Sequence, residues 1–88
     1  MKGLVYILQS AKNNSYYIGS TIDLDRRFTD HSSGLVVATR NLLPMNMVFF
    51  QEYKTIKQAR QVEYRLKRFK SRKIIEQIII DGEIKMGS

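Results

Sequence analysis

The sequence predicts an α/β (α+β) domain: a small, three-stranded, mainly antiparallel sheet flanked by helices, in the order β-β-α-β-α-α. Two observations lead to this class. First, apolar and aromatic runs with the length of β-strands lie at residues 3–8, 16–20 and 47–53. Second, the stretches after the second and third runs carry apolar residues at helical spacing, behind Ser, Thr or Asp residues that can cap a helix.

The length of the chain limits it to one domain. With 88 residues there is room for one hydrophobic core, and a chain of this size buries only about 60% of its unfolded surface. We therefore expect a single domain over residues 1–88, with its core at about residues 3–82 and a tail at residues 83–88.

The charge of the chain is strongly positive. Fifteen Lys and Arg residues stand against eight Asp and Glu residues, which gives a net charge of +7, and the pI is near 9.9. A pI above about 9 is typical of nucleic-acid-binding domains, although a basic surface can also serve solubility alone.

The absence of cysteine and of long apolar segments indicates the compartment. Without cysteine the chain forms no disulfides and has no thiolate chemistry, which is typical of reducing, cytoplasmic surroundings. The apolar run at the N-terminus is too short for a signal peptide or a membrane span. We therefore expect a cytoplasmic protein without a membrane partner.

The two N-terminal runs predict a β-hairpin. The run "GLVYIL" is continuously apolar and aromatic, as in a central strand that is covered on both faces. The sequence "AKNNS" favours a turn, and "YYIGS" predicts the second strand. If the loop takes residues 10–13, Tyr6 lies directly opposite Tyr17 and both rings point to the same face.

A short helix is predicted after the hairpin. Thr21 or Asp23 can cap a helix that runs to about His31 and ends before Gly34. Arg27 and His31 are spaced i, i+4 on this helix, so their side chains point the same way, one turn apart.

The C-terminal half predicts a strand and two helices. A connection that contains Pro44 leads to the strand "MVFFQEY". Thr55 and a glutamine three residues later form a capping box, which opens a helix over about residues 56–69. Ser71 can cap a last helix, "RKIIEQIIID", that Gly82 ends.

The helix at residues 56–69 has an apolar face with a carboxylate beside it. Glu63 falls about 60° from the centre of this face, which predicts a half-buried position on its shoulder. The apolar face consists of Ile56, Ala59, Val62, Leu66 and Phe69.

A basic cluster spans the end of this helix and the start of the last one. The segment "RLKRFKSRK" holds six Lys and Arg residues in nine positions. Such a cluster favours contact with a phosphate backbone, and the alternative is a solvated basic face. The predicted nucleic-acid-binding residues are Arg65, Lys67, Arg68, Lys70, Arg72 and Lys73.

The remaining candidates for chemistry each have a structural interpretation when taken singly. The two hairpin tyrosines can be a cross-strand aromatic pair, and Arg27 can form an ion pair one turn back. His31 can interact with the dipole of its helix end. Glu63 can pair with Arg60 or Lys67 on its own helix.

Taken together, four segments resemble the GIY-YIG endonuclease superfamily. They are "VYI", "YIG", "DLDRRFTDH" and "ARQVEYRLK". The resemblance extends over about residues 3–80 and is closest to the small stand-alone branch related to the N-terminal nuclease domain of UvrC. A Tyr-Ile-Gly tripeptide alone is common, whereas two tyrosine motifs followed by Arg, His and Glu at this spacing are specific.

The resemblance implies an enzyme that hydrolyses phosphodiester bonds in DNA with one divalent cation, Mg²⁺ or Mn²⁺. Tyr6 and Tyr17 match the tyrosines of the two motifs. Arg27 matches the family's arginine, and His31 stands where relatives have His or Tyr. Glu63 matches the glutamate that holds the cation.

These residue types suit phosphodiester hydrolysis. Arg27 can clamp phosphate oxygens and stabilise developing charge, and a cation on Glu63 can polarise the phosphate. A tyrosine has a pKa of about 10, and the positive charges of Arg27 and of a metal close by are expected to lower that pKa toward phenolate. Whether Tyr6 or Tyr17 takes the proton of the water stays open, as does whether His31 relays a proton or binds a tyrosine.

The chain departs from the family pattern at two places. The first motif reads Val5-Tyr6-Ile7 instead of Gly-Ile-Tyr, and no asparagine follows Asn46, although many relatives carry one on the last helix. The leading hypothesis is a metal-dependent DNA endonuclease, in DNA repair or structure-specific cleavage. The alternatives are a non-catalytic nucleic-acid-binding module with this fold and a basic protein-interaction domain. DNA is the expected partner, RNA is an open alternative, a recruiting protein is a further candidate, and no oligomeric state is indicated.

Overall fold

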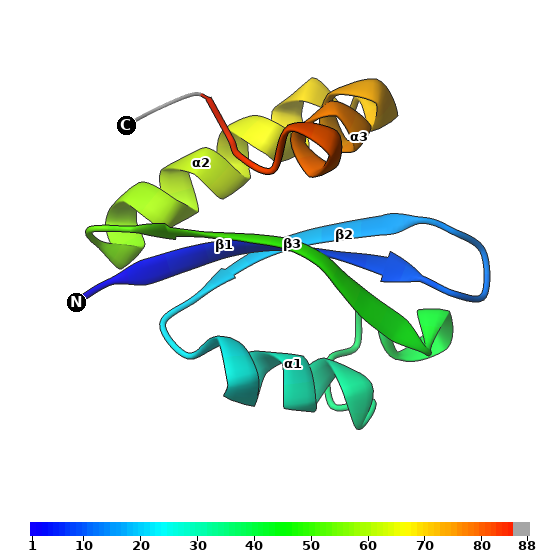
Figure 1. The fold of residues 1–88 in the computed structure, drawn as a ribbon. Helices are drawn as coiled ribbons and strands as arrows, with labels where there is room; N and C mark the ends of the chain where they lie inside the picture. Colours follow the sequence, from blue (N-terminus) through cyan, green and yellow to red (C-terminus); the bar gives the residue numbers. More distant parts are fainter. Residues whose placement is uncertain (86–88) are drawn as a thin grey trace.

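The fold consists of a three-stranded antiparallel sheet between two layers of helices, as predicted (Figure 1). A computed structural model describes residues 1–85 of the chain. The strand order is β2-β1-β3, so the first strand is central. The strands are β1 (Gly3–Ser10), β2 (Tyr16–Thr21) and β3 (Met45–Tyr53).

The helices lie on opposite faces of this sheet (Figure 1). The C-terminal pair covers one face and the first helix covers the other. No helix within residues 1–85 has the length and apolar character needed to cross a membrane. The helices are α1 (Leu24–Ser32), a 3₁₀ turn η1 (Arg40–Leu42), α2 (Ile56–Phe69) and α3 (Arg72–Asp81).

The predicted caps set the beginnings of the three α-helices. The Asp23 side chain accepts a hydrogen bond from the backbone N–H of Arg26, so Asp23 rather than Thr21 is the cap of α1. Thr55 and Ser71 cap α2 and α3 in the same way. These local signals therefore predicted where each helix begins.

The register of the hairpin differs from the expected one by two residues. Tyr6 lies opposite Gly19, and Tyr17 lies opposite Leu8. The expectation that Tyr6 faces Tyr17 directly was wrong because the connection takes residues 11–15 instead of a shorter loop. Since side chains alternate with a period of two, a shift of two residues leaves both rings on the same face of the sheet.

The core has two layers, one on each side of β1. Four successive β1 residues are buried, as expected for a central strand. On one face they pack with Ala59, Val62 and Leu66 of α2. Phe69 was expected on this apolar face but is 50% exposed, because Leu66 is the last α2 residue in the core and Phe69 lies beyond it.

The chain after α3 returns to the sheet. The side chain of Gln51 on β3 accepts a hydrogen bond from the Ile84 N–H at 2.8 Å and donates one to the Ile84 carbonyl at 3.3 Å. The Ile84 side chain is buried in the core. The packed core thus reaches two residues past residue 82, and residues 86–88 of the expected tail lie outside the described residues.

Candidate active site

The predicted site residues converge at β2, which is an edge strand of the sheet. Tyr6 and Tyr17 lie on the face covered by α1. Ser20 pairs with Val5, whose side chain packs on the α2 face, so Ser20 points to that second face. Glu63 of α2 binds Ser20 there. The site is therefore assembled from both faces around one strand.

His31 sits at the centre of the half-site on the α1 face. Its side chain is fully buried, and its Nε2 lies 2.9 Å from the Tyr6 hydroxyl. Its Nδ1 lies 2.7 Å from the hydroxyl of Thr39, which is also buried. The imidazole meets the Tyr6 and Tyr17 rings edge-on, at centroid distances of 5.7 and 5.1 Å. These contacts fix the positions of both tyrosines through His31.

Burial favours the neutral form of the His31 imidazole. Desolvation lowers the pKa of the His31 imidazole, and the nearby Arg27 guanidinium lowers it further. A neutral imidazole has one donor nitrogen and one acceptor nitrogen, and the two hydroxyls that it meets can each serve either role. His31 therefore holds Tyr6 and Thr39 without an added charge in the core.

Arg27 connects this buried cluster with the surface. Its Nε donates a hydrogen bond of 3.4 Å to the Tyr6 hydroxyl, and its side chain is half-buried. Burial raises the pKa of the Tyr6 hydroxyl, and the hydrogen bond from Arg27 offsets this only in part. Beside Arg27 alone, desolvation therefore outweighs the guanidinium at Tyr6, and the expected shift toward phenolate beside both Arg27 and a metal stays a prediction.

Gly19 makes room for the Tyr6 ring. A Cβ atom built on Gly19 would overlap the hydroxyl and the ring carbons of Tyr6. The glycine is therefore required by the close approach of the tyrosine, and the second motif of the sequence supports the tyrosine of the first.

Glu63 forms the half-site on the α2 face. The Ser20 hydroxyl donates to its Oε1, and Lys67 Nζ lies 2.5 Å from its Oε2. Its side chain is 19% exposed, which agrees with the predicted shoulder position. Of its two predicted partners it pairs with Lys67, and within residues 1–85 it forms no ion pair with Arg60. Lys67 Nζ also lies 5.7 Å from the centre of the Tyr17 ring and so links the two half-sites.

An open cleft of about 410 Å³ lies beside this edge. Arg27 of α1 and Arg60 of α2 both line it. Two guanidinium groups on one cleft can neutralise a phosphate that enters it. Its other lining residues are Met1, Ser20, Thr21, Ile22 and Ile56.

Glu63 is the residue here that could hold a divalent cation. Within residues 1–85 no group of three or more His, Cys, Asp or Glu side chains is arranged for a metal. A single carboxylate suits Mg²⁺ that keeps several waters and shares substrate phosphates. Because Lys67 occupies Oε2, the residues fit such a cation once the ammonium group moves aside.

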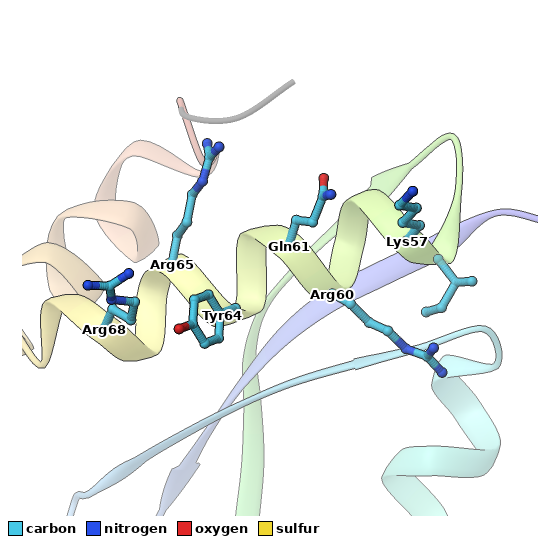
Figure 2. Close-up of a pocket in the computed structure, with 7 residues that line it drawn as sticks. Lys57, Arg60, Gln61, Tyr64, Arg65 and Arg68 are labelled. Atoms are coloured by element: carbon cyan, nitrogen blue, oxygen red, sulfur yellow. The ribbon is translucent and has the colours of Figure 1, made fainter.

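Residues of the basic cluster make different contacts. Lys67 turns toward Glu63. Arg72 lies over the ring of Tyr16 at 4.6 Å and pairs with Glu76 at 3.3 Å. Arg65 and Arg68 line an open groove along α2 (Figure 2).

Three residues of the site were not predicted as site residues from the sequence. Ser20 directly follows the Tyr-Ile-Gly motif, so its place beside the site was readable from the strand alternation. Arg60 was considered only as an ion-pair partner. Thr39 lies in an irregular segment, and no local pattern links it with His31.

Comparisons with known proteins agree with the arrangement of these residues. Residues 2–75 match the GIY-YIG catalytic domain. A UPF0213 protein of Streptococcus pneumoniae serotype 4 is 37% identical over 70 residues, which cover 78% of this chain and 70% of that protein. A UPF0213 protein of Halalkalibacterium halodurans is 34% identical over 83 residues, or 93% of this chain and 87% of that protein.

A solved structure gives the same result for the fold. The solution NMR structure of a UPF0213 protein from Bacillus halodurans superposes with a TM-score of 0.59 at 34% identity. The match covers 93% of this chain and 87% of that one. The matched domain and these relatives confirm the resemblance found in the four sequence segments. The chain therefore belongs to the GIY-YIG family of nuclease domains, and within it to the UPF0213 proteins.

Proposed function

We propose that the protein is a divalent-metal-dependent endonuclease that hydrolyses phosphodiester bonds in DNA. The observation that carries this proposal is the convergence of Arg27 and Glu63, from opposite faces of the sheet, around the edge strand that holds Tyr17. The basic charge of the chain supports a polyanionic substrate. Structure-specific cleavage, as in DNA repair, is the proposed setting, with recruitment by a protein partner in the cytoplasm as one route to its targets.

Arg27 is the proposed phosphate clamp. Its guanidinium lies at the cleft and is fixed by the Tyr6 hydroxyl. In the reaction a bond forms between a water oxygen and phosphorus while the bond from phosphorus to the leaving oxygen breaks. Negative charge grows on the phosphoryl oxygens during this exchange, and Arg27 stabilises it. Mg²⁺ or Mn²⁺ on Glu63 would supply charge neutralisation at the phosphate when bound.

Tyr17 is the proposed general base: as phenolate it takes the proton of the attacking water and becomes the neutral phenol. Tyr6 is 1% exposed, and its hydroxyl is already bound to His31 and Arg27. Tyr17 is half-buried, so water can reach it more readily. We assign Tyr6 and His31 to positioning, because both are buried and they contact Arg27 and Tyr17 respectively.

A comparison of two neighbouring arginines tests the proposal. The protein is incubated with plasmid, nicked, branched and flapped DNA in Mg²⁺ or Mn²⁺. We expect Arg27→Ala and Glu63→Ala to lower cleavage at least 100-fold, as for the loss of one charge-stabilising group. Arg26→Ala removes the same charge from the exposed neighbour and should leave the rate within about twofold. Cleavage by the wild type that equals cleavage by Arg27→Ala would refute the enzymatic proposal for those substrates.

A non-catalytic nucleic-acid-binding module is the second candidate. The observations in its favour are the absence of an asparagine after Asn46 and the ion pair that Lys67 makes with Glu63. Salt-dependent DNA binding that Arg27→Ala and Glu63→Ala leave unchanged, without cleavage of any substrate, would support this candidate over the nuclease.

A further inference from the structure

A basic groove of about 570 Å³ runs along the exposed side of α2 (Figure 2). Four of its seven lining residues are Lys or Arg, and none is acidic. Within residues 1–85 none of these four cations takes part in an ion pair. The lining residues are Ile56, Lys57, Arg60, Gln61, Tyr64, Arg65 and Arg68.

Three of these residues form a row along the helix. Arg60, Tyr64 and Arg68 follow one another at i, i+4 spacing, and Figure 2 shows Tyr64 between the two arginines. Each step along the row is about 6 Å. Tyr64 is 62% exposed, and the Arg68 guanidinium lies 5.7 Å from the centre of its ring.

This row is joined to the candidate active site. Arg60 and Ile56 line both the groove and the cleft that contains Arg27. From Lys57 to Arg68 the helix extends about 16 Å, which is long enough for a few nucleotides of one strand. A strand that lies in the groove therefore leads directly to the cleft.

We propose that the row of Arg60, Tyr64 and Arg68 binds an unpaired nucleic-acid strand next to the cleavage point. The two guanidinium groups contact phosphates, and one base stacks on Tyr64. A charged groove with an aromatic side chain between cations is typical of single-strand binding. Bases within a duplex already stack on one another, so they leave no free face for Tyr64. The inference rests on the proposed nuclease function and specifies its substrate as DNA with an unpaired strand, such as a flap.

Binding measurements with three variants test the stacking contact. Fluorescence anisotropy is recorded in the Arg27→Ala background, with a labelled single strand of DNA, the same sequence in RNA, a blunt duplex and a flapped duplex. We expect Tyr64→Leu to weaken binding of the single strand and of the flap about tenfold. Tyr64→Phe keeps the ring and should stay within twofold, as should Phe50→Leu, which changes an exposed aromatic residue on β3.

The two arginines of the row are tested by salt dependence. Arg60→Gln and Arg68→Gln should each reduce the slope of log affinity against log salt by about 0.7 for a single strand. Arg40→Gln, at the exposed 3₁₀ turn, should leave the slope unchanged. Binding to DNA is compared with binding to RNA of the same sequence. Equal losses of affinity for both would indicate a contact that depends on base stacking alone.

Two outcomes would overturn the inference, and neither depends on catalysis. One is a Tyr64→Leu variant that binds single strands and flaps like the parent. The other is an equal loss of affinity for the blunt duplex, which would indicate general backbone binding. If the wild type cleaves DNA while Tyr64→Leu binds normally, the proposal of strand binding in the groove is refuted and the nuclease proposal is kept. If Tyr64→Leu loses flap binding but no substrate is cut, the nuclease proposal is refuted and the proposal of strand binding in the groove is kept.

Discussion

The hydroxyl of Tyr6 and the Nε2 of His31 are 2.9 Å apart, and both side chains are at most 1% exposed. This hydrogen bond joins the first tyrosine motif to the helix that carries Arg27. It places His31 inside the core, away from any phosphate that enters the cleft. The histidine thus holds the tyrosine in place, which agrees with its proposed role in positioning Tyr6.

Replacement of His31 by Phe should destabilise the fold. The variant leaves the buried Thr39 hydroxyl without its partner and the Tyr6 hydroxyl with the bond from Arg27 alone, and an unsatisfied buried group costs about 1–3 kcal/mol. We expect the free energy of unfolding to fall by about 3 kcal/mol in urea titrations. Thr29→Ala, on the exposed side of the same helix, should change it by less than about 1 kcal/mol. Equal effects of the two substitutions would show that the buried network does not stabilise the protein.

The same histidine should make stability depend on pH. Its pKa is lowered in the folded protein relative to about 6.5 in the unfolded chain. The unfolded chain therefore binds more protons between the two values, so stability is full above pH 6.5 and falls as the pH drops toward the folded pKa. Thermal unfolding between pH 7.5 and pH 5 should show a falling Tm in the wild type and a smaller fall in His31→Phe. A parallel fall in both proteins would assign the effect to other groups.

Gly19 and Tyr6 should show energetic coupling. Gly19→Ala places a methyl group against the Tyr6 ring and hydroxyl, and overpacking of this kind costs about 1–3 kcal/mol. In the Tyr6→Phe background the hydroxyl is absent, so the additional cost of Gly19→Ala should be smaller. A double-mutant cycle from urea titrations measures the difference. Strict additivity of the two changes would contradict the close contact.

Lys67 should compete with a divalent cation for Glu63. The ammonium group lies 2.5 Å from Oε2, so its removal frees the carboxylate. We expect Lys67→Gln to bind Mn²⁺ several-fold more tightly in calorimetric titrations and Glu63→Gln to lose this binding. The stability of Lys67→Gln should change by no more than about 0.5 kcal/mol, because the lysine is half exposed.

A second ion pair provides the control for this experiment. Lys85→Gln breaks another i, i+4 pair, with Asp81, and should leave Mn²⁺ binding unchanged. If Lys67→Gln binds Mn²⁺ no better than Lys85→Gln, the lysine does not compete with the cation. The nuclease proposal would then rest on Arg27 and the cleft alone.

The elements of the fold were predictable because their signals are local. Asp23, Thr55 and Ser71 each cap the helix that follows them within a few residues. The hairpin register was not predictable from these signals, because it depends on how many residues the turn takes, and a two-residue error leaves the alternation intact. Phe69 fits the helical apolar pattern, but α2 continues past its last core contact at Leu66.

The sequence predicted several of the residues that lie together at β2, and it predicted their contacts less well. The spacing of Arg27 and His31 placed both on one side of a helix, yet it could not show that His31 is buried and Arg27 is not. That difference depends on the segment after α1, which brings Thr39 against the imidazole. Likewise, the position of Glu63 on its helix predicted partial burial, while its bond with Ser20 depends on how α2 crosses the sheet.

The place of the site at β2 also has a consequence for dynamics. Within the described sheet this strand is hydrogen-bonded to one neighbour only, and edge elements of this kind open locally at lower cost than a domain core. Both half-sites contact this strand. A local opening of β2 would therefore separate the residues of both half-sites in a single event. Catalytic competence should then be lost before the global fold, and amide hydrogen exchange along β2 would follow that loss directly.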